Sequence, residues 1–325
     1  MALRSGTLLL AALACSLSSE AVAQESACLA DAGPLAGAEG VTFRNGPESA
    51  QGYGSLRVEA AHGAHMYIYF DDASEAEARS RAACLGKQLD VLRAVMGDTR
   101  SDAEWNSVVF TSDAAYLPPR GDVMTHWVID TAQSDIELAD RVLNLVPHEQ
   151  VHEFQGRNNT QLPRWISEGH ASWVEHQVLA QLDEATAATS RAERIAALEN
   201  ATGPLNLANW GSVRPKPEAI LRQISKEDRR RMEDDPDYMP KGTYTFTSDD
   251  LEGDESNMPA RYAGALLVFE GLAARHGADA VDNWLRELTA SGEKLRDETI
   301  AQSIRMHFGE DVETLLSDTQ FAVTY

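Results

Sequence analysis

Basic residues are scarce in this sequence. Its 325 residues include 28 Lys and Arg against 51 Asp and Glu, which gives a formal net charge of −23 at pH 7. Nucleic acids and anionic membrane surfaces both select Lys and Arg. The charge therefore argues against both classes of partner, and we expect no nucleic-acid binding.

Long apolar runs and phosphate-binding loops are also missing. The most apolar stretch, residues 7–17, is shorter than the roughly 20 residues that a membrane-spanning helix needs, so we expect no transmembrane segment. The sequence has no glycine-rich phosphate loop. It also lacks the residue context that Ser-His-Asp or Cys-His catalysis would require.

The N-terminal segment has the features of a secretory signal peptide. Arg4 supplies positive charge, residues 7–17 form a short apolar run, and residues 21–23 (Ala-Val-Ala) form a small-residue cleavage signal. We expect residues 1–23 to direct export, to the periplasm or the medium. The alternative is a lipoprotein anchored through Cys15, since the residues before it partly resemble a lipidation signal.

Only three cysteines are present, and two of them lie beyond the expected signal peptide. An exported chain with two cysteines can join them, so a Cys28–Cys84 disulfide is expected, with two separate thiols as the alternative. Neither cysteine has a partner at C-x-x-C spacing. Cysteine is therefore not expected to bind a metal here.

The most informative stretch reads H-E-x-x-H. His148 and His152 are four residues apart, so on a helix they lie only about 40° from each other around the axis and leave the same face. Two nitrogens that converge in this way suit a small cation, and Glu149 is close enough to reach a water beside it. A catalytic zinc site normally takes a third protein ligand, for which Glu168 is suitably placed. The alternative is a solvated helix face that carries two histidines.

The downstream segment 165–175 reads W-I-S-E-G-H-A-S-W-V-E. Placed after H-E-x-x-H, it resembles the gluzincin zinc metallopeptidases, in particular the peptidase MA-like group and more distantly the aminopeptidase-N-like branch. The motifs that match lie within a stretch of about thirty residues, and the order of elements is more loosely similar from about residue 65 to 315. The resemblance implies that His148, His152 and Glu168 are zinc ligands, and that Glu149 is the general base.

The resemblance also implies a fold. We expect an α+β, mostly helical protein, with a gluzincin or thermolysin-like catalytic domain that has a small N-terminal sheet and a helical C-terminal half. In this division residues 24–61 are a loosely structured lead-in and residues 62–325 form the metallopeptidase-like domain. Residues 62–156 hold the sheet and the zinc helix. Residues 157–325 form the helical half, with a polar insertion or lid at 226–258.

Apolar periodicity places the main elements. We expect strands at residues 66–70, 107–111 and 124–129, and an amphipathic helix at 74–96. In the gluzincins the last strand before the zinc helix lies along the edge of the cleft, where an extended peptide can add to it. The helix after Pro163 is expected to approach the zinc helix closely through Gly169 and Ala171.

The zinc helix itself contains a proline. Ser134 and Glu137 fit a capping box that opens the helix. Pro147, directly before His148, either kinks this helix or begins a new one, because proline cannot donate a backbone hydrogen bond. The apolar pattern runs through Pro147 and favours a kink.

Three further residues are candidates near the site. Tyr262 opens a helix that resembles a gluzincin C-terminal helix, where a tyrosine can reach the reacting carbonyl, so it is a candidate catalytic oxyanion donor. The alternative is a buried core tyrosine. Glu175 either orients a ligand histidine or is a surface carboxylate. His170 lies on a different face from Glu168 and is a poor ligand.

Taken together, these features predict an exported zinc-dependent metallohydrolase, most simply a metallopeptidase with Zn²⁺ as cofactor and a peptide or protein as substrate. Two alternatives stay open. One is a catalytically inactive zinc-bearing binding or structural module. The other is a zinc hydrolase of a non-peptide amide or ester.

Overall fold

The structure is a computed structural model. It describes residues 42–46, 53–60, 63–98, 100, 103–112, 126–211, 213–235, 238, 245, 247, 250–253 and 257–321. The expected signal peptide, Cys15 and Cys28 lie outside the described residues, so export, lipid attachment and the Cys28–Cys84 pairing stay predictions. No helix in the described ranges combines the length and apolar character that crossing a membrane requires.

A five-stranded sheet forms the N-terminal part. In spatial order its strands are β1 (Thr42–Asn45), β2 (Gly54–Glu59), β3 (His65–Phe70), β4 (Ser107–Thr111) and β5 (His126–Asp130). The first three are antiparallel, and β3, β4 and β5 run parallel. The strands expected at 66–70 and 107–111 are confirmed, and the third lies at 126–130. The last strand before the histidine helix, β5, is at the edge of the sheet, and its place along the edge of a cleft stays a prediction.

Two of these strands lie within residues 24–61, which we expected to be loosely structured. In β2, Leu56 and Val58 are buried and alternate with partly exposed residues. This period of two is typical of a strand with one face on the core. The expected boundary at residue 62 is therefore wrong, because β1 and β2 belong to the sheet.

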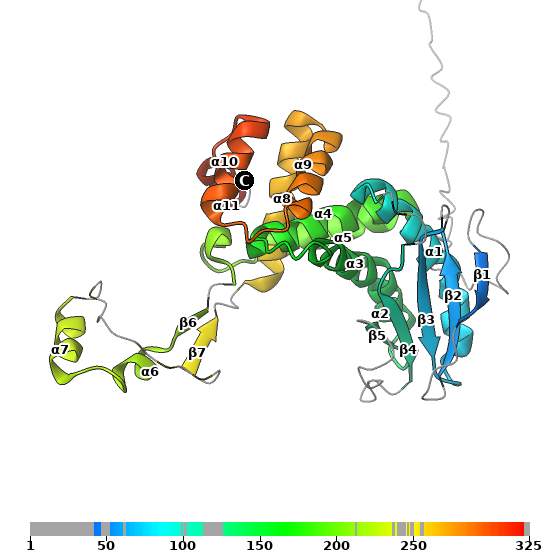
Figure 1. The fold of residues 1–325 in the computed structure, drawn as a ribbon, viewed down its shortest axis with the longest axis horizontal. Coiled ribbons are helices and arrows are strands. Elements are labelled where there is room, and N and C mark those ends of the chain that lie inside the picture. The colour runs from blue at the N-terminus through cyan, green and yellow to red at the C-terminus, as the bar shows by residue number, and fades with distance from the viewer. Residues whose placement is uncertain are drawn as a thin grey trace, which may run out of the picture.

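Helices make up most of the remaining chain. They are α1 (Glu75–Met96), α2 (Asp135–Asp140), the π-helix η2 (Arg141–Leu145), α3 (Val146–Gly156), α4 (Arg164–Leu182), α5 (Glu184–Glu199), α8 (Met258–His276), α9 (Ala278–Ala290), α10 (Asp297–Phe308) and α11 (Val312–Phe321). Helices α3, α4 and α5 lie between the sheet and the C-terminal helices (Figure 1). The expected α+β, mostly helical class with a small N-terminal sheet is confirmed.

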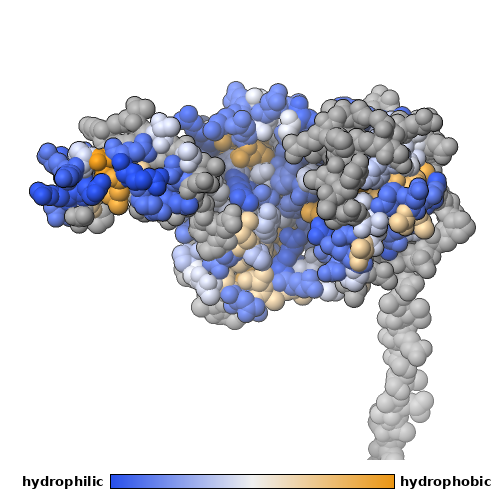
Figure 2. Space-filling view, turned by 90° about the horizontal axis from the view of Figure 1, so that it is seen from below, coloured by the Kyte–Doolittle hydropathy of each residue, from blue (hydrophilic) through white to orange (hydrophobic). Residues whose placement is uncertain are grey.

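Between α5 and α8 the chain forms a projecting arm. It contains β6 (Val213–Pro215), α6 (Pro217–Leu221), α7 (Lys226–Asp234) and β7 (Leu251–Gly253), and it follows a 3₁₀ turn, η3 (Leu207–Asn209). The arm extends away from the helical body and is mostly hydrophilic (Figures 1 and 2). Because β6 pairs with β7, the arm begins near Val213. We expected the polar insertion to begin later, at residue 226.

The helix that carries H-E-x-x-H is continuous across Pro147. The capping box at Ser134 is present, and α2, η2 and α3 follow one another with helical dihedrals at each junction. Proline lacks an N–H and crowds the carbonyl four residues earlier. The π-helical turn accommodates this, and the buried Gln88 side chain donates a 2.7 Å hydrogen bond to the Val142 carbonyl. The chain therefore does not break before His148.

At Gly169, helix α4 packs tightly against α8. A Cβ built at this position would lie 2.3 Å from Phe269 Cε2 and 3.2 Å from Ala265 Cβ, both on α8. Our expectation that Gly169 fits α4 against the histidine helix is therefore wrong about the partner. Its missing side chain lets α8, which carries Tyr262, approach α4, which carries Glu168.

We predict that Gly169→Ala lowers the free energy of unfolding by about 1–3 kcal/mol, because the added methyl group overlaps the Phe269 ring. Denaturant unfolding measures this change. Gly156→Ala is the matched control: it lies at the end of α3, and no atom comes within 4 Å of the position that its added Cβ would take. Equal stability of the two variants would contradict the close packing of α4 on α8.

Candidate metal centre

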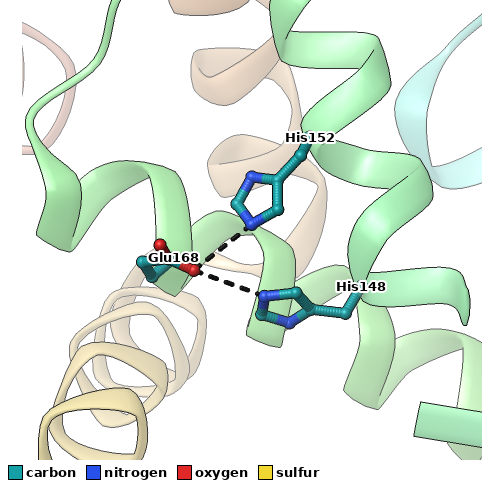
Figure 3. Close-up of side chains that lie close together, drawn as sticks. All are labelled: His148, His152 and Glu168. Atoms are coloured by element: carbon teal, nitrogen blue, oxygen red, sulfur yellow. Dashed lines mark hydrogen bonds and ion pairs between the residues drawn. The ribbon is translucent and has the colours of Figure 1, made fainter. Parts of the chain in front are cut away.

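Two neighbouring helices bring the three expected ligands together. His148 and His152 leave one face of α3, with ring centroids 5.0 Å apart. Helix α4 packs beside α3 and places the Glu168 Oε2 atom 3.4 Å from His148 Nε2 and 3.2 Å from His152 Nε2 (Figure 3). One ligand atom from each residue lies within 4.8 Å of the others, which is close enough for one metal ion.

The H-E-x-x-H helix is fixed to the sheet by a residue between the two histidines. Gln150 is fully buried, and its amide makes two hydrogen bonds to the backbone of Asn106, just before β4. The Gln150 oxygen accepts from the Asn106 N–H at 3.1 Å, and its nitrogen donates to the Asn106 carbonyl at 2.8 Å. This pair of bonds sets the rotation of α3, so the opposite face presents His148 and His152 to Glu168.

His148 is held by a buried carboxylate. Its Nδ1 lies 3.1 Å from Glu175 Oε2, and the Glu175 side chain is only 3% exposed. The other Glu175 oxygen accepts a hydrogen bond from Arg194 of α5. The interpretation of Glu175 as a surface carboxylate is therefore wrong: it is buried and in contact with His148.

His152 is held by a neutral amide that sequence reasoning missed. Its Nδ1 donates to Gln155 Oε1 at 2.9 Å, one turn further along α3. Gln155 in turn donates to the Ser167 carbonyl and to Nδ1 of the fully buried His170. Burial lowers the pKa of His170 to about 3, so its ring is a neutral acceptor. Among the described residues, the group that could hold a metal ion consists of His148, His152 and Glu168.

These partners decide which nitrogen of each ring is available. With Nδ1 of His148 and His152 donating to Glu175 and Gln155, Nε2 is the nitrogen of each ring that faces the Glu168 carboxylate and is left for a metal. The other oxygen of Glu168, Oε1, forms an ion pair with Arg164, whose Nε lies 3.5 Å away. Two imidazole nitrogens and one carboxylate oxygen are a donor set that zinc accepts, with a fourth position left for solvent.

In the absence of a metal, a proton on the histidines balances the negative charge of the carboxylates. Burial opposes the charge on His148, but its contacts with Glu168 and Glu175 outweigh that effect and raise its pKa to about 9. Burial likewise opposes the charge on Glu168, but both histidines hold the pKa of Glu168 well below its usual range. The metal-free site is therefore an ion-paired cluster.

Glu149 and Tyr262 border the same cavity as His148. Burial, together with the charge of Glu168, raises the pKa of Glu149 despite the two histidines. Burial and Glu168 also raise the pKa of Tyr262, against the opposing effect of Arg164, so its hydroxyl stays protonated. The Tyr262 ring is half-buried, 5.9 Å from the His148 ring and 4.9 Å from the Trp210 ring.

The cavity has a volume of about 440 Å³ and lies between η2, α3, α5 and α8. Its lining includes Asp140, Asn144, His148, Glu149, Glu175, Ser190, Glu193, Arg194 and Tyr262. The side chains of His148, Glu168 and His152 remain 12%, 14% and 26% exposed. A small molecule or an extended segment could therefore reach the three converging atoms.

Comparisons with known proteins give structural neighbours only. No family model and no curated protein matches this chain. Among solved structures, leukotriene A4 hydrolase from Saccharomyces cerevisiae has 12% identity and a TM-score of 0.47, and the match covers 85% of this chain and 37% of that one. A mutant M1 zinc metallopeptidase from Deinococcus radiodurans, bound to a Tyr-Ser-Ala substrate, has 16% identity and a TM-score of 0.42, covering 88% and 52%.

A third structure, a two-domain M1 zinc metallopeptidase mutant bound to L-tryptophan, has 16% identity and a TM-score of 0.42, covering 86% of this chain and 51% of that one. This chain thus spans between about a third and a half of the length of the structures it resembles. Its function must be argued from its own residues.

We predict that zinc affinity rises about tenfold per pH unit between pH 6.5 and 8.5. Zinc must displace the proton of His148, whose pKa is about 9 in the metal-free protein. Competition with a chromophoric chelator across this range measures the slope. The same proton stabilises the metal-free fold below pH 6.5, and that contribution is lost as the pH rises through 9.

The control for this titration is His152→Ala, which should remove the tight site at every pH. His276→Ala, on a histidine that pairs with Glu310 at the surface, should leave the affinity and its slope unchanged. A pH-independent affinity would show that His148 does not exchange a proton for the metal.

Proposed function

We propose that this chain is a zinc-dependent hydrolase that cleaves peptide bonds. The observation that carries this proposal is the convergence of His148 Nε2, His152 Nε2 and Glu168 Oε2, beside a cavity that His148 lines. Glu149, with a raised pKa, borders the same cavity. The H-E-x-x-H and W-x-x-E-G-x-A segments supply these same residues.

In this proposal His148, His152 and Glu168 hold Zn²⁺. The ion would supply Lewis acidity, which lowers the pKa of a water molecule towards 7 and polarises a carbonyl group. The chain's own residues do the remaining work. Glu149 accepts a proton from the attacking water and returns it to the leaving amine, for which a pKa above the usual carboxylate value is suitable.

Tyr262 is proposed as the donor to the reacting oxygen. Its hydroxyl is protonated at neutral pH, because burial and the nearby Glu168 raise its pKa. Helix α8 holds the ring beside His148, on the wall of the cavity. A hydrogen bond from this hydroxyl would strengthen as negative charge develops on the carbonyl oxygen, so it would stabilise the transition state more than the substrate.

A purely structural zinc module is the less suitable alternative. Structural zinc sites usually close with a fourth protein ligand. In the part of the chain that the structure describes, the group around His148 has three members, and His148 itself borders a cavity. A non-peptide amide or ester would use the same residues, and the choice between substrates is left to experiment.

We predict that the zinc-loaded protein cuts a diverse peptide mixture and that Glu149→Gln slows this cleavage by about 10²–10⁴-fold while its zinc content stays unchanged. Mass spectrometry maps the cuts, with a chelator-treated sample as the blank. Glu153→Gln is the matched control, since it removes a carboxylate from the same helix that pairs with Arg157. Equal rates for the parent and Glu149→Gln would exclude the proposed mechanism.

We predict that Tyr262→Phe lowers kcat by about 10²–10³-fold with little change in KM or zinc affinity, because the lost hydrogen bond is made mainly in the transition state. Steady-state kinetics on one cleaved peptide measures this. Tyr238→Phe, which removes a hydroxyl bonded to Asp228 on the arm, should have no effect. A parent-like kcat for Tyr262→Phe would leave this ring a packing role only.

A further inference from the structure

Arg194 is joined to the proposed metal centre through one intervening residue. Its guanidinium donates to Glu175 Oε1, while Glu175 Oε2 lies 3.1 Å from His148 Nδ1. These three side chains come from α5, α4 and α3. The contacts therefore run in one line from a helix that holds none of the proposed ligands to a ring that is one of them.

The Glu175 carboxylate is buried and has few ways to satisfy both of its oxygens. Its side chain borders the cavity but is only 3% exposed, so water solvates little of it. A buried charge requires a partner of opposite sign and hydrogen bonds to both oxygens. With Arg194 on Oε1, the carboxylate keeps one orientation and Oε2 stays on His148. Without Arg194, Oε1 would have to find another partner, and the carboxylate would rotate away from the histidine.

The other arginine of the same face of α5 differs in its environment. Arg191 lies one turn before Arg194, pairs with Glu270 of α8 and is 45% exposed, whereas Arg194 is 20% exposed. An exposed ion pair contributes little to structure because water screens it. The chain thus provides a pair of arginines on one helix, of which Arg194 is the one that contacts Glu175.

We propose that Arg194 is a positioning residue for the metal centre: it fixes Glu175 so that the His148 ring keeps Nε2 directed towards Glu168 and His152. This inference rests on the proposed function only in so far as His148, His152 and Glu168 bind zinc. Residues behind the ligands typically change metal affinity by about 10–100-fold when they are replaced, because the ligand ring then has to be ordered on binding.

The test is the zinc affinity of the full-length protein, measured with zinc alone in competition with a chromophoric chelator. We expect Arg194→Met to weaken zinc binding by about 10–100-fold. Arg194→Lys should show a smaller loss, since it restores the charge without the guanidinium geometry. Arg191→Met should stay within about twofold of the parent, since Arg191 is exposed and pairs with Glu270 of α8.

A double-mutant cycle separates positioning from a general effect on the fold. If Arg194 acts through Glu175, adding Arg194→Met to Glu175→Gln should cause no further loss of zinc affinity. Near-UV circular dichroism and thermal unfolding in the presence of chelator check that each variant is folded. Should Arg194→Met disrupt the fold, Arg194→Lys with Glu175→Gln still completes the comparison.

Zinc binding by Arg194→Met and Arg194→Lys that equals the parent would overturn the inference, and so would losses that simply add to those of Glu175→Gln. If the parent binds no zinc, or if His152→Ala binds it as tightly as the parent, the metal centre itself is wrong and the role of Arg194 falls with it. The two failures are therefore distinguishable by the His152→Ala sample.

Discussion

The site depends on one oxygen atom that two imidazole rings share. Glu168 Oε2 faces Nε2 of both His148 and His152, so three ionisable side chains converge on one point. Such a cluster is costly to bury unless its charges are balanced. The surrounding helices are arranged so that it is balanced, and every other contact of the site supports this one.

Three packing features keep the cluster together, and none of them contains a ligand. Gln150 sets the rotation of α3 through the backbone of Asn106. Gln88 satisfies a carbonyl in the π-helical turn, which allows the helix to continue through Pro147. Gly169 lets α8 lie directly on α4. The positions of the histidines, the glutamate and the tyrosine are thus set by residues of three different helices.

Local patterns in the sequence predicted much of this arrangement. The four-residue spacing of His148 and His152, the capping box at Ser134 and the strand at 66–70 all follow from rules that act within one turn or one strand, and each is present. The short alternation of Leu56 and Val58 carried the same kind of signal for β2, but it is too brief to stand out in a segment rich in small residues.

Contacts between elements were the part that the sequence did not reveal. Gln155 could have been suspected, since it lies one turn after His152 on the same helix. Arg194 could not, because 19 residues and a helix boundary separate it from Glu175, and only the packing of α5 on α4 brings them together. The predicted packing partner of Gly169 was wrong for the same reason. A glycine in a helix indicates that another element packs closely there, but it does not indicate which element.

The two histidines differ in the group that contacts Nδ1 of the ring, and this difference would affect how strongly a bound ion attracts electrons. Glu175 is anionic but is neutralised by Arg194, while Gln155 and the unprotonated His170 bring no charge at all. A divalent ion held by two neutral rings and the Glu168 carboxylate would therefore keep one unit of positive charge. A second unpaired carboxylate behind His152 would cancel that charge, so under the proposed function the amide of Gln155 would keep the ion able to polarise a carbonyl oxygen.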